Sequence, residues 1–142
     1  MRIHTETLEK QHIEIKAIMA QILKSLDIPA LQKDAEEARG LVSRLVGKLS
    51  VHLAMEDNVL YPNLASSSDP RLKEMGNSFQ DKMGGLLKAL KTYQSSWPTV
   101  GSVQTNPHQF IKDTTVLFDA LNERIKLEDE VLFAAINSRP AR

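Results

Sequence analysis

Apolar residues recur every three or four positions in four long stretches of the chain, which is the period of a helix with one buried face. The first stretch follows Thr5, an expected N-cap, and ends at 27–29, and the second begins between Pro29 and Asp34 and runs to about Asn63. The four faces are Leu8, His12, Ile15, Met19, Ile22 and Leu26; Val42, Leu45, Leu49, His52, Glu56 and Val59; Leu72, Gly76, Phe79, Met83, Leu86, Leu90, Tyr93 and Trp97; and Phe110, Thr114, Leu117, Leu121, Arg124, Glu128, Val131 and Ala135.

Helix breakers separate these stretches. The third begins at Asp69-Pro70 and the fourth at Asn106-Pro107, each with proline at the first helical position. Residues 98–107 are rich in Pro, Gly, Ser and Thr and predict an unstructured connection. No stretch alternates as a strand does. The pattern therefore predicts an all-α fold, an up-down-up-down four-helix bundle, as a single domain over residues 1–142.

Polar residues interrupt three of the four apolar faces. His12 lies on the first, His52 and Glu56 on the second, and Arg124 and Glu128 on the fourth. A buried carboxylate is costly unless it is paired or coordinates a metal. Residues near the middle of antiparallel helices share one layer, so we expect these side chains to meet there, with Met83 of the third helix close by.

Imidazoles and carboxylates are suitable ligands for iron, manganese or zinc. His12, His52, Glu56 and Glu128 are therefore the candidate metal ligands. Arg124 stays protonated and cannot bind a metal, but its guanidinium can pair with a carboxylate. Two interpretations remain open: a metal centre supported from outside by Arg124 and Met83, or a metal-free network in which Arg124 bridges the two glutamates and the imidazoles supply hydrogen bonds.

The sequence resembles the hemerythrin-like, or HHE cation-binding, domains. His12 matches the histidine of their first helix, and residues 52–62, which begin His-Leu-Ala-Met-Glu-Asp and end Leu-Tyr-Pro, match the second-helix motif throughout. Residues 124–133 match the fourth-helix motif, but Arg124 stands where the family has histidine. On the third helix, Phe79 and Met83 stand at the family's histidine positions.

The resemblance implies which ligands are kept. Family members hold two irons bridged by two carboxylates. By this likeness His12 and His52 are terminal ligands of one iron, Glu56 and Glu128 are the bridges, and positions 79, 83 and 124 have lost the other iron's ligands. We expect one divalent metal, with iron as the first choice and manganese or zinc as alternatives, and no di-iron centre. The Arg124 guanidinium would take the place of the missing metal.

From these expectations we rank three candidate functions. The first is a non-catalytic sensor or regulator that responds to oxygen, nitric oxide, redox state or metal supply, with a small gas as a ligand. The alternative is a metal-free hemerythrin-like protein-interaction module whose partner protein the sequence does not identify. An enzyme ranks last, because the chain has no Glu-x-x-His pairs of the ferritin-like oxidases and no glycine-rich phosphate loop.

Composition narrows the class of protein further. Of 142 residues, 18 are basic and 18 acidic, so the electrostatic footprint of a nucleic-acid binder is missing. The chain has no cysteine, which excludes disulfides and thiolate metal sites. No apolar run reaches the ~18 residues of a membrane span, and the start of the chain lacks the apolar core of a signal peptide. We therefore expect a cytoplasmic protein that contacts neither nucleic acid nor membrane.

Overall fold

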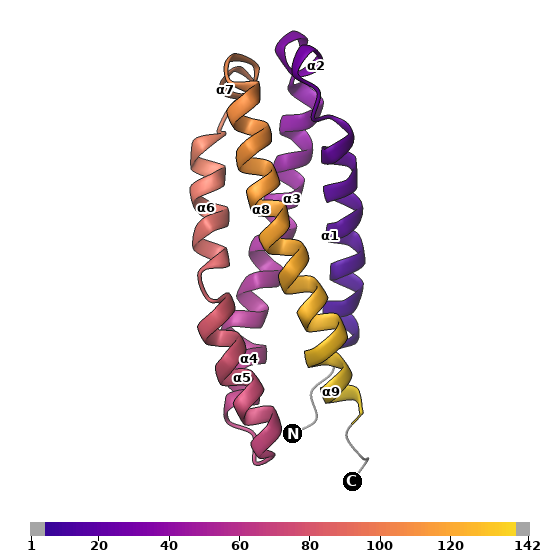
Figure 1. Cartoon of the computed structure of the whole chain (residues 1–142), viewed down its shortest axis with the longest axis vertical. Coiled ribbons are helices and arrows are strands. Elements are labelled where there is room, and N and C mark those ends of the chain that lie inside the picture. Colours follow the sequence, from indigo (N-terminus) through magenta and orange to yellow (C-terminus); the bar gives the residue numbers. More distant parts are fainter. Residues whose placement is uncertain (1–4, 139–142) are drawn as a thin grey trace.

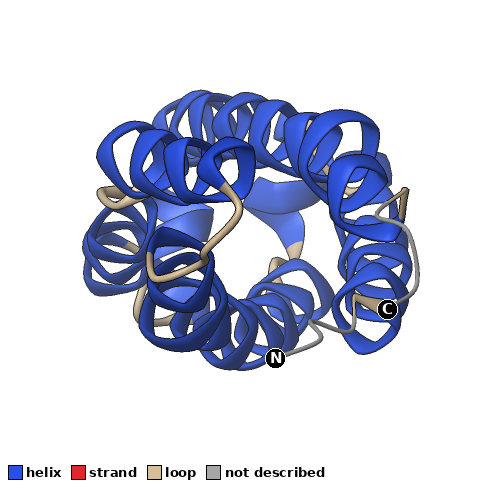
Figure 2. Ribbon diagram, turned by 90° about the horizontal axis from the view of Figure 1, so that it is seen from below, coloured by secondary structure: helices blue, strands red, loops and turns tan. Residues whose placement is uncertain are grey.

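The computed structural model describes residues 5–138 and is helical throughout that range apart from short turns. The segment in which we expect no signal peptide includes residues 1–4, and these four residues lie outside the described range. Long helical segments run side by side along the longest axis of the molecule (Figure 1). Seen along that axis, they surround a common centre (Figure 2). The all-α prediction is thereby confirmed.

The segments follow one another with few interruptions. The first half of the described chain consists of α1 (Glu6–Lys24), α2 (Ile28–Lys33), α3 (Glu36–Met55), the π-helical turn η1 (Glu56–Leu60) and α4 (Tyr61–Ala65). The second half consists of α5 (Pro70–Met83), α6 (Leu86–Ser96), α7 (Val100–Thr105), α8 (Pro107–Leu127), the π-helical turn η2 (Glu128–Leu132) and α9 (Phe133–Asn137). Helix α1 packs against α3, α4 against α5, and α6 against both α3 and α8.

Two helix starts were predicted from capping residues, with different outcomes. Asp69 caps α5 as expected, because its carboxylate accepts a hydrogen bond from the backbone N–H of Arg71. Thr5 is the N-cap residue of α1, as predicted, but its side chain makes no capping hydrogen bond. The Thr5 hydroxyl instead donates to the carboxylate of Glu9 and accepts from the Asn137 amide, which ties the start of α1 to the end of α9.

The connections contain more structure than the sequence pattern indicates. The prediction that residues 98–107 are unstructured is wrong, because α7 occupies most of that stretch. Thr99 accepts a hydrogen bond from the Ser102 backbone, and the Ser102 hydroxyl accepts one from the Thr99 backbone. This reciprocal capping satisfies the first donors of a short helix in which Gly and Thr lower helix propensity.

Glycines interrupt the third helical stretch and allow one part of it to pack closely against its neighbour. The predicted single helix breaks at Gly84 and Gly85, between α5 and α6. At Gly76 a Cβ atom would lie 2.6 Å from the backbone nitrogen of Ala65. Only glycine therefore permits the close approach of α5 to α4.

The predicted apolar faces are buried for most of their length, with two errors at equivalent places. Val59 is 55% and Val131 41% exposed, although both were assigned to the core. Each lies in a π-helical turn, where the backbone N–H of the residue after the turn bonds the carbonyl five positions back, at Glu56 and at Glu128. The wider turn contains one extra residue, which rotates the following side chains so that Leu60 and Leu132 face the core.

The core consists of two hydrophobic clusters. The larger includes Ile15, Leu49 and Leu121, and the smaller includes Leu8 and Leu132. His12, which lies between Leu8 and Ile15 on α1, belongs to neither, and the other buried polar residues of the predicted layer occupy the corresponding places on their helices. No helix in the described part of the chain is long and apolar enough to span a bilayer.

Candidate metal centre

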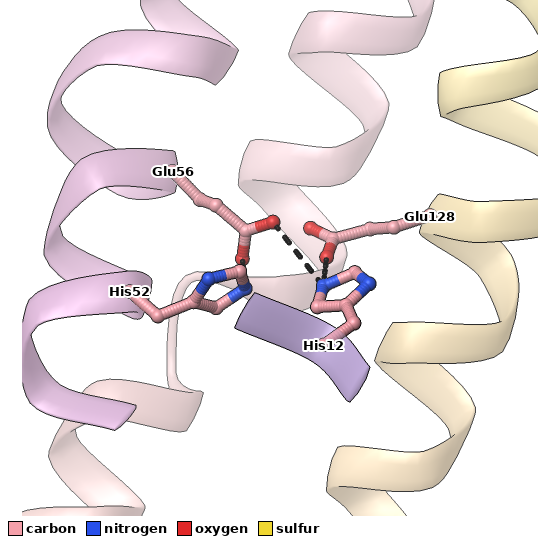
Figure 3. Close-up of side chains that lie close together, drawn as sticks. All are labelled: His12, His52, Glu56 and Glu128. Atoms are coloured by element: carbon pink, nitrogen blue, oxygen red, sulfur yellow. Dashed lines mark ion pairs between the residues drawn. The ribbon is translucent and has the colours of Figure 1, made fainter. Parts of the chain in front are cut away.

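Four buried side chains from four elements meet between the two clusters. His12 comes from α1, His52 from the last turn of α3, and Glu56 and Glu128 are the first residues of η1 and η2. One ligand atom of each lies within 4.8 Å of the others, and none of the four residues is more than 2% exposed. The two carboxylates face each other with both imidazoles beside them (Figure 3). The predicted convergence of these residues is confirmed.

The imidazoles contact the carboxylates through their Nε2 atoms. His12 Nε2 lies 3.0 Å from Glu128 Oε1 and 3.8 Å from Glu56 Oε2. His52 Nε2 lies 3.2 Å from Glu56 Oε1. These imidazole–carboxylate contacts connect α1, α3, η1 and η2 at one small polar site.

The buried atoms that face this space indicate which ligand it can hold. Four buried atoms here have no hydrogen-bond partner: His12 Nε2, His52 Nε2, Glu56 Oε2 and Glu128 Oε1. Each ligand residue thus contributes one orphaned atom, although buried polar atoms in folded proteins are nearly always satisfied. Two imidazole nitrogens and two carboxylate oxygens are ligands that divalent iron, zinc or manganese accepts. The residues therefore fit a metal ion.

The outer nitrogen of each imidazole has its own acceptor. His12 Nδ1 lies 2.7 Å from Asp129 Oδ1, and His52 Nδ1 lies 2.6 Å from Gln11 Oε1. Partners of this kind fix the tautomer and ring orientation of metal-binding histidines. The sequence pattern predicted neither acceptor. The Glu-Asp doublet that opens each π-helical turn is a signal for Asp129, whereas Gln11 has no sequence signal beyond its position next to His12.

Arg124 is fully buried and contacts both carboxylates. Its Nη2 lies 3.0 Å from Glu56 Oε1 and 3.1 Å from Asp57 Oδ1, and its Nε lies 3.4 Å from Glu128 Oε2. Its Nη1 donates to the backbone carbonyl of Met83 at 3.1 Å. Met83 therefore contacts Arg124 through its main chain, while its half-buried side chain packs against the smaller cluster.

Tyr61 also contacts this site, and the sequence pattern did not predict its role there. Its hydroxyl donates a hydrogen bond to Glu128 Oε2, and its ring lies 5.3 Å from the guanidinium carbon of Arg124. The side chain is fully buried. Arg124 and Tyr61 together donate to Glu56 Oε1 and Glu128 Oε2, the carboxylate oxygens that are not orphaned.

A family model for the hemerythrin HHE cation-binding domain matches residues 4–136. The chain belongs to this family. No curated protein and no solved structure gives a significant match. Within the hemerythrin family match, the grouped His12, His52, Glu56 and Glu128 are the residues that the sequence motifs indicated.

The two glutamates of this hemerythrin domain differ in acidity. Burial, reinforced by the nearby Glu128 carboxylate, raises the pKa of Glu56 to about 11. Burial also acts to raise the pKa of Glu128, but the adjacent His12 and Glu56 side chains, the charge of Arg124 and the hydrogen bond from Tyr61 outweigh it and lower the pKa to about 2. Without a metal, the facing carboxylates therefore share one proton at neutral pH.

The two histidines differ as well. Burial, together with the neighbouring His12, lowers the pKa of His52 to about 4. Burial also acts to lower the pKa of His12, but the carboxylates of Glu128 and Asp129 outweigh it and raise the pKa above the usual value. His52 is thus a neutral imidazole at physiological pH, the form that binds metal.

Proposed function

We propose that this hemerythrin-like protein binds one divalent metal ion through His12, His52, Glu56 and Glu128. The observation that carries the proposal is that each of these residues directs into the same space one buried atom that has no hydrogen-bond partner. Iron is the first choice, and manganese and zinc suit the same ligands. A bound redox-active metal supplies a centre for electron transfer and for binding small gases. The protein residues hold that ion and exclude water.

The surroundings of the glutamates support a single ion. Arg124 and Tyr61 already donate hydrogen bonds to Glu56 Oε1 and Glu128 Oε2, so these two oxygens would be less available to a second metal. The guanidinium also carries a fixed positive charge within 3.0 Å of Glu56. At such separations a second cation would be repelled strongly in a buried environment.

We further propose that the centre serves a sensor or regulator of oxygen, nitric oxide, redox state or metal supply. Support comes from the burial of the ligands, which are at most 2% exposed. A diatomic gas or an electron reaches such a site more readily than a bulky substrate does. The proposal includes the predicted up-down-up-down course, supported by reversals of the chain at α2, at residues 66–69 and at α7.

A metal-free interaction module is the second candidate function. The observation that favours it is the extent of pairing already present: Arg124 contacts Glu56, Asp57 and Glu128, and Tyr61 donates to Glu128. With one proton on Glu56, the buried charges of Arg124 and Glu128 balance, and Asp57 is partly exposed. The four facing atoms have no hydrogen-bond partner in this network, however, and a metal ion would satisfy them.

Elemental analysis of protein purified without a metal-affinity tag tests the proposal. We expect about one equivalent of transition metal per chain, and a lower melting temperature after chelation, because the ion links several helices. In Glu128→Gln the metal should be lost, whereas the control Glu130→Gln removes the same charge from an exposed position and should keep it. Less than about a tenth of an equivalent, with melting unchanged by chelator, would favour the interaction module.

A further inference from the structure

The acceptors on the two imidazoles are chemically unequal. Asp129, which holds His12, offers a carboxylate on η2, the same element that carries the ligand Glu128. Gln11, which holds His52, offers a neutral amide from α1. Helix α1 packs against α3, which carries His52. The two histidines are therefore fixed by partners that differ in charge and in structural origin.

The contacts of His52 determine where its ring proton lies. Nδ1 is 2.6 Å from Gln11 Oε1 in hydrogen-bond geometry, whereas Nε2 has no hydrogen-bond partner although Glu56 Oε1 is 3.2 Å away. The proton therefore lies on Nδ1, and Nε2 turns its lone pair toward the carboxylates. In a neutral imidazole one nitrogen is a donor and the other an acceptor, so fixing the first fixes the second.

The Gln11 amide is itself held in one orientation. Its Nε2 approaches the sulfur of Met55 at 3.9 Å, which leaves Oε1 facing His52. The side chain is only half-buried and lines a surface groove between α1 and α3, together with Glu14, Lys48 and Val51. A residue reached from the surface thus contacts a buried ligand candidate directly.

We propose that Gln11 is a positioning residue, which holds His52 as the Nδ1–H tautomer with its Nε2 lone pair aimed into the metal site. Asp129 holds His12 as the Nδ1–H tautomer in the same way, and its carboxylate places a negative charge beside that ring. This assignment rests on the proposed metal binding for its consequence, but the tautomer itself is a property of the metal-free protein. Because a carboxylate partner makes an imidazole a stronger ligand than an amide does, His12 is the stronger and His52 the weaker of the two ligands.

Three variants separate positioning from a structural role. Gln11→Ala removes the acceptor, and Gln11→Glu keeps an acceptor and adds the charge that Asp129 has. Glu14→Ala is the matched control, because Glu14 lines the same groove one turn along α1 but pairs with Lys48. Imidazole 15N–1H correlation spectra of the metal-free protein at alkaline pH, where the histidines are neutral, report the tautomer of each ring.

We expect His52 to carry its proton on Nδ1 in the wild type, in Glu14→Ala and in Gln11→Glu. In Gln11→Ala we expect the Nε2–H form to appear at His52 and not at His12. An unchanged His52 tautomer in Gln11→Ala, or an Nε2–H form in the wild type, would overturn the assignment.

Titration with Zn²⁺ against a competing chelator provides the second measurement. Loss of a partner to a metal-binding histidine costs about 10- to 100-fold in affinity, so Gln11→Ala should bind Zn²⁺ more weakly by that factor and Gln11→Glu more tightly than the wild type. Equal affinity in Gln11→Ala and Glu14→Ala would contradict the positioning role. A wild type that binds no metal, yet shows the locked tautomer, would reject the proposed function while leaving the tautomer assignment confirmed.

Discussion

Arg124 Nη2 lies 3.0 Å from Glu56 Oε1, which joins two residues that are 68 positions apart in the chain and fully buried. The guanidinium supplies a permanent positive charge to Glu56 Oε1 and Glu128 Oε2, whereas Glu56 Oε2 and Glu128 Oε1 are orphaned. This relationship explains how a hemerythrin domain that lacks histidines at positions 79, 83 and 124 can keep two buried glutamates.

Removing that cation should damage both the fold and the site. Arg124→Ala leaves Glu56 and Glu128 without their buried partner, and loss of one member of a buried ion pair costs about 3–5 kcal/mol. We expect a lower free energy of unfolding by about that amount, measured by urea denaturation, together with weaker metal retention. Arg44→Ala, at an exposed position on α3, is the control and should change neither. Unchanged melting and metal content in Arg124→Ala would reject the role given to Arg124.

Tyr61 should matter to the metal site as well as to stability. Tyr61→Phe removes the hydroxyl that donates to Glu128, and a hydrogen bond to a charged group contributes about 1.5–3 kcal/mol. Tyr93→Phe is a matched comparison, because the Tyr93 hydroxyl is bonded to that of Thr114, also in the core. We expect both variants to melt at lower temperature, but only Tyr61→Phe to weaken Zn²⁺ binding. Equal metal affinity in the two variants would contradict the link between Tyr61 and the site.

Metal binding should release protons. With its pKa raised to about 11, Glu56 is protonated in the metal-free protein at neutral pH, and it must lose that proton to bind a cation. Apparent affinity should therefore fall about tenfold for each unit of pH decrease, and more steeply once His12, whose pKa is also raised, becomes protonated. Calorimetry in buffers of different ionisation enthalpy should count about one released proton near pH 8. Affinity that does not change between neutral and alkaline pH would contradict the shared-proton state of the glutamates.

The π-helical turn after Glu56 should tolerate loss of one residue. The Tyr61 backbone N–H bonds the Glu56 carbonyl across this turn, so deletion of the exposed Val59 turns that bond into an ordinary helical one. The residues beyond the turn keep their buried faces. We expect this deletion variant to fold, as measured by circular dichroism and melting, but to bind metal weakly because Glu56 and Asp57 are reoriented.

Deletion of Val51 is the matched control for this experiment. Val51 is also exposed, but it lies in the regular helix α3. Its loss shifts every residue on one side of the deletion by about 100°, which turns apolar side chains toward water. This variant should fail to fold. If both deletions are equally disruptive, the π-helical turn is not a one-residue insertion.

The sequence pattern predicted the parts of the site that helical periodicity determines. His12, His52, Glu56, Arg124 and Glu128 lie on regular apolar faces, and a residue on such a face is buried wherever the helix packs. They meet because the helices that carry them pack side by side (Figure 1).

The same reasoning failed where the backbone leaves the regular period. Val59 and Val131 were assigned to the core because a uniform helix was assumed through both π-helical turns. Local helix preference does not encode where a helix takes a π-helical turn. Gln11 and Tyr61 were missed for a related reason: each contacts the site from a neighbouring helix, at an angle that periodicity on its own helix cannot reveal.

Anomalous scattering from crystals of the protein, purified without added metal, tests the central claim most directly. We expect one peak per chain, bounded by the Nε2 atoms of His12 and His52 and by carboxylate oxygens of Glu56 and Glu128, with the absorption edge identifying the element. The Arg124 guanidinium should remain beside Glu56 with no density for a second ion there. A second peak at Arg124, or no peak among the four residues in crystals soaked with Fe²⁺, Mn²⁺ or Zn²⁺, would contradict the account.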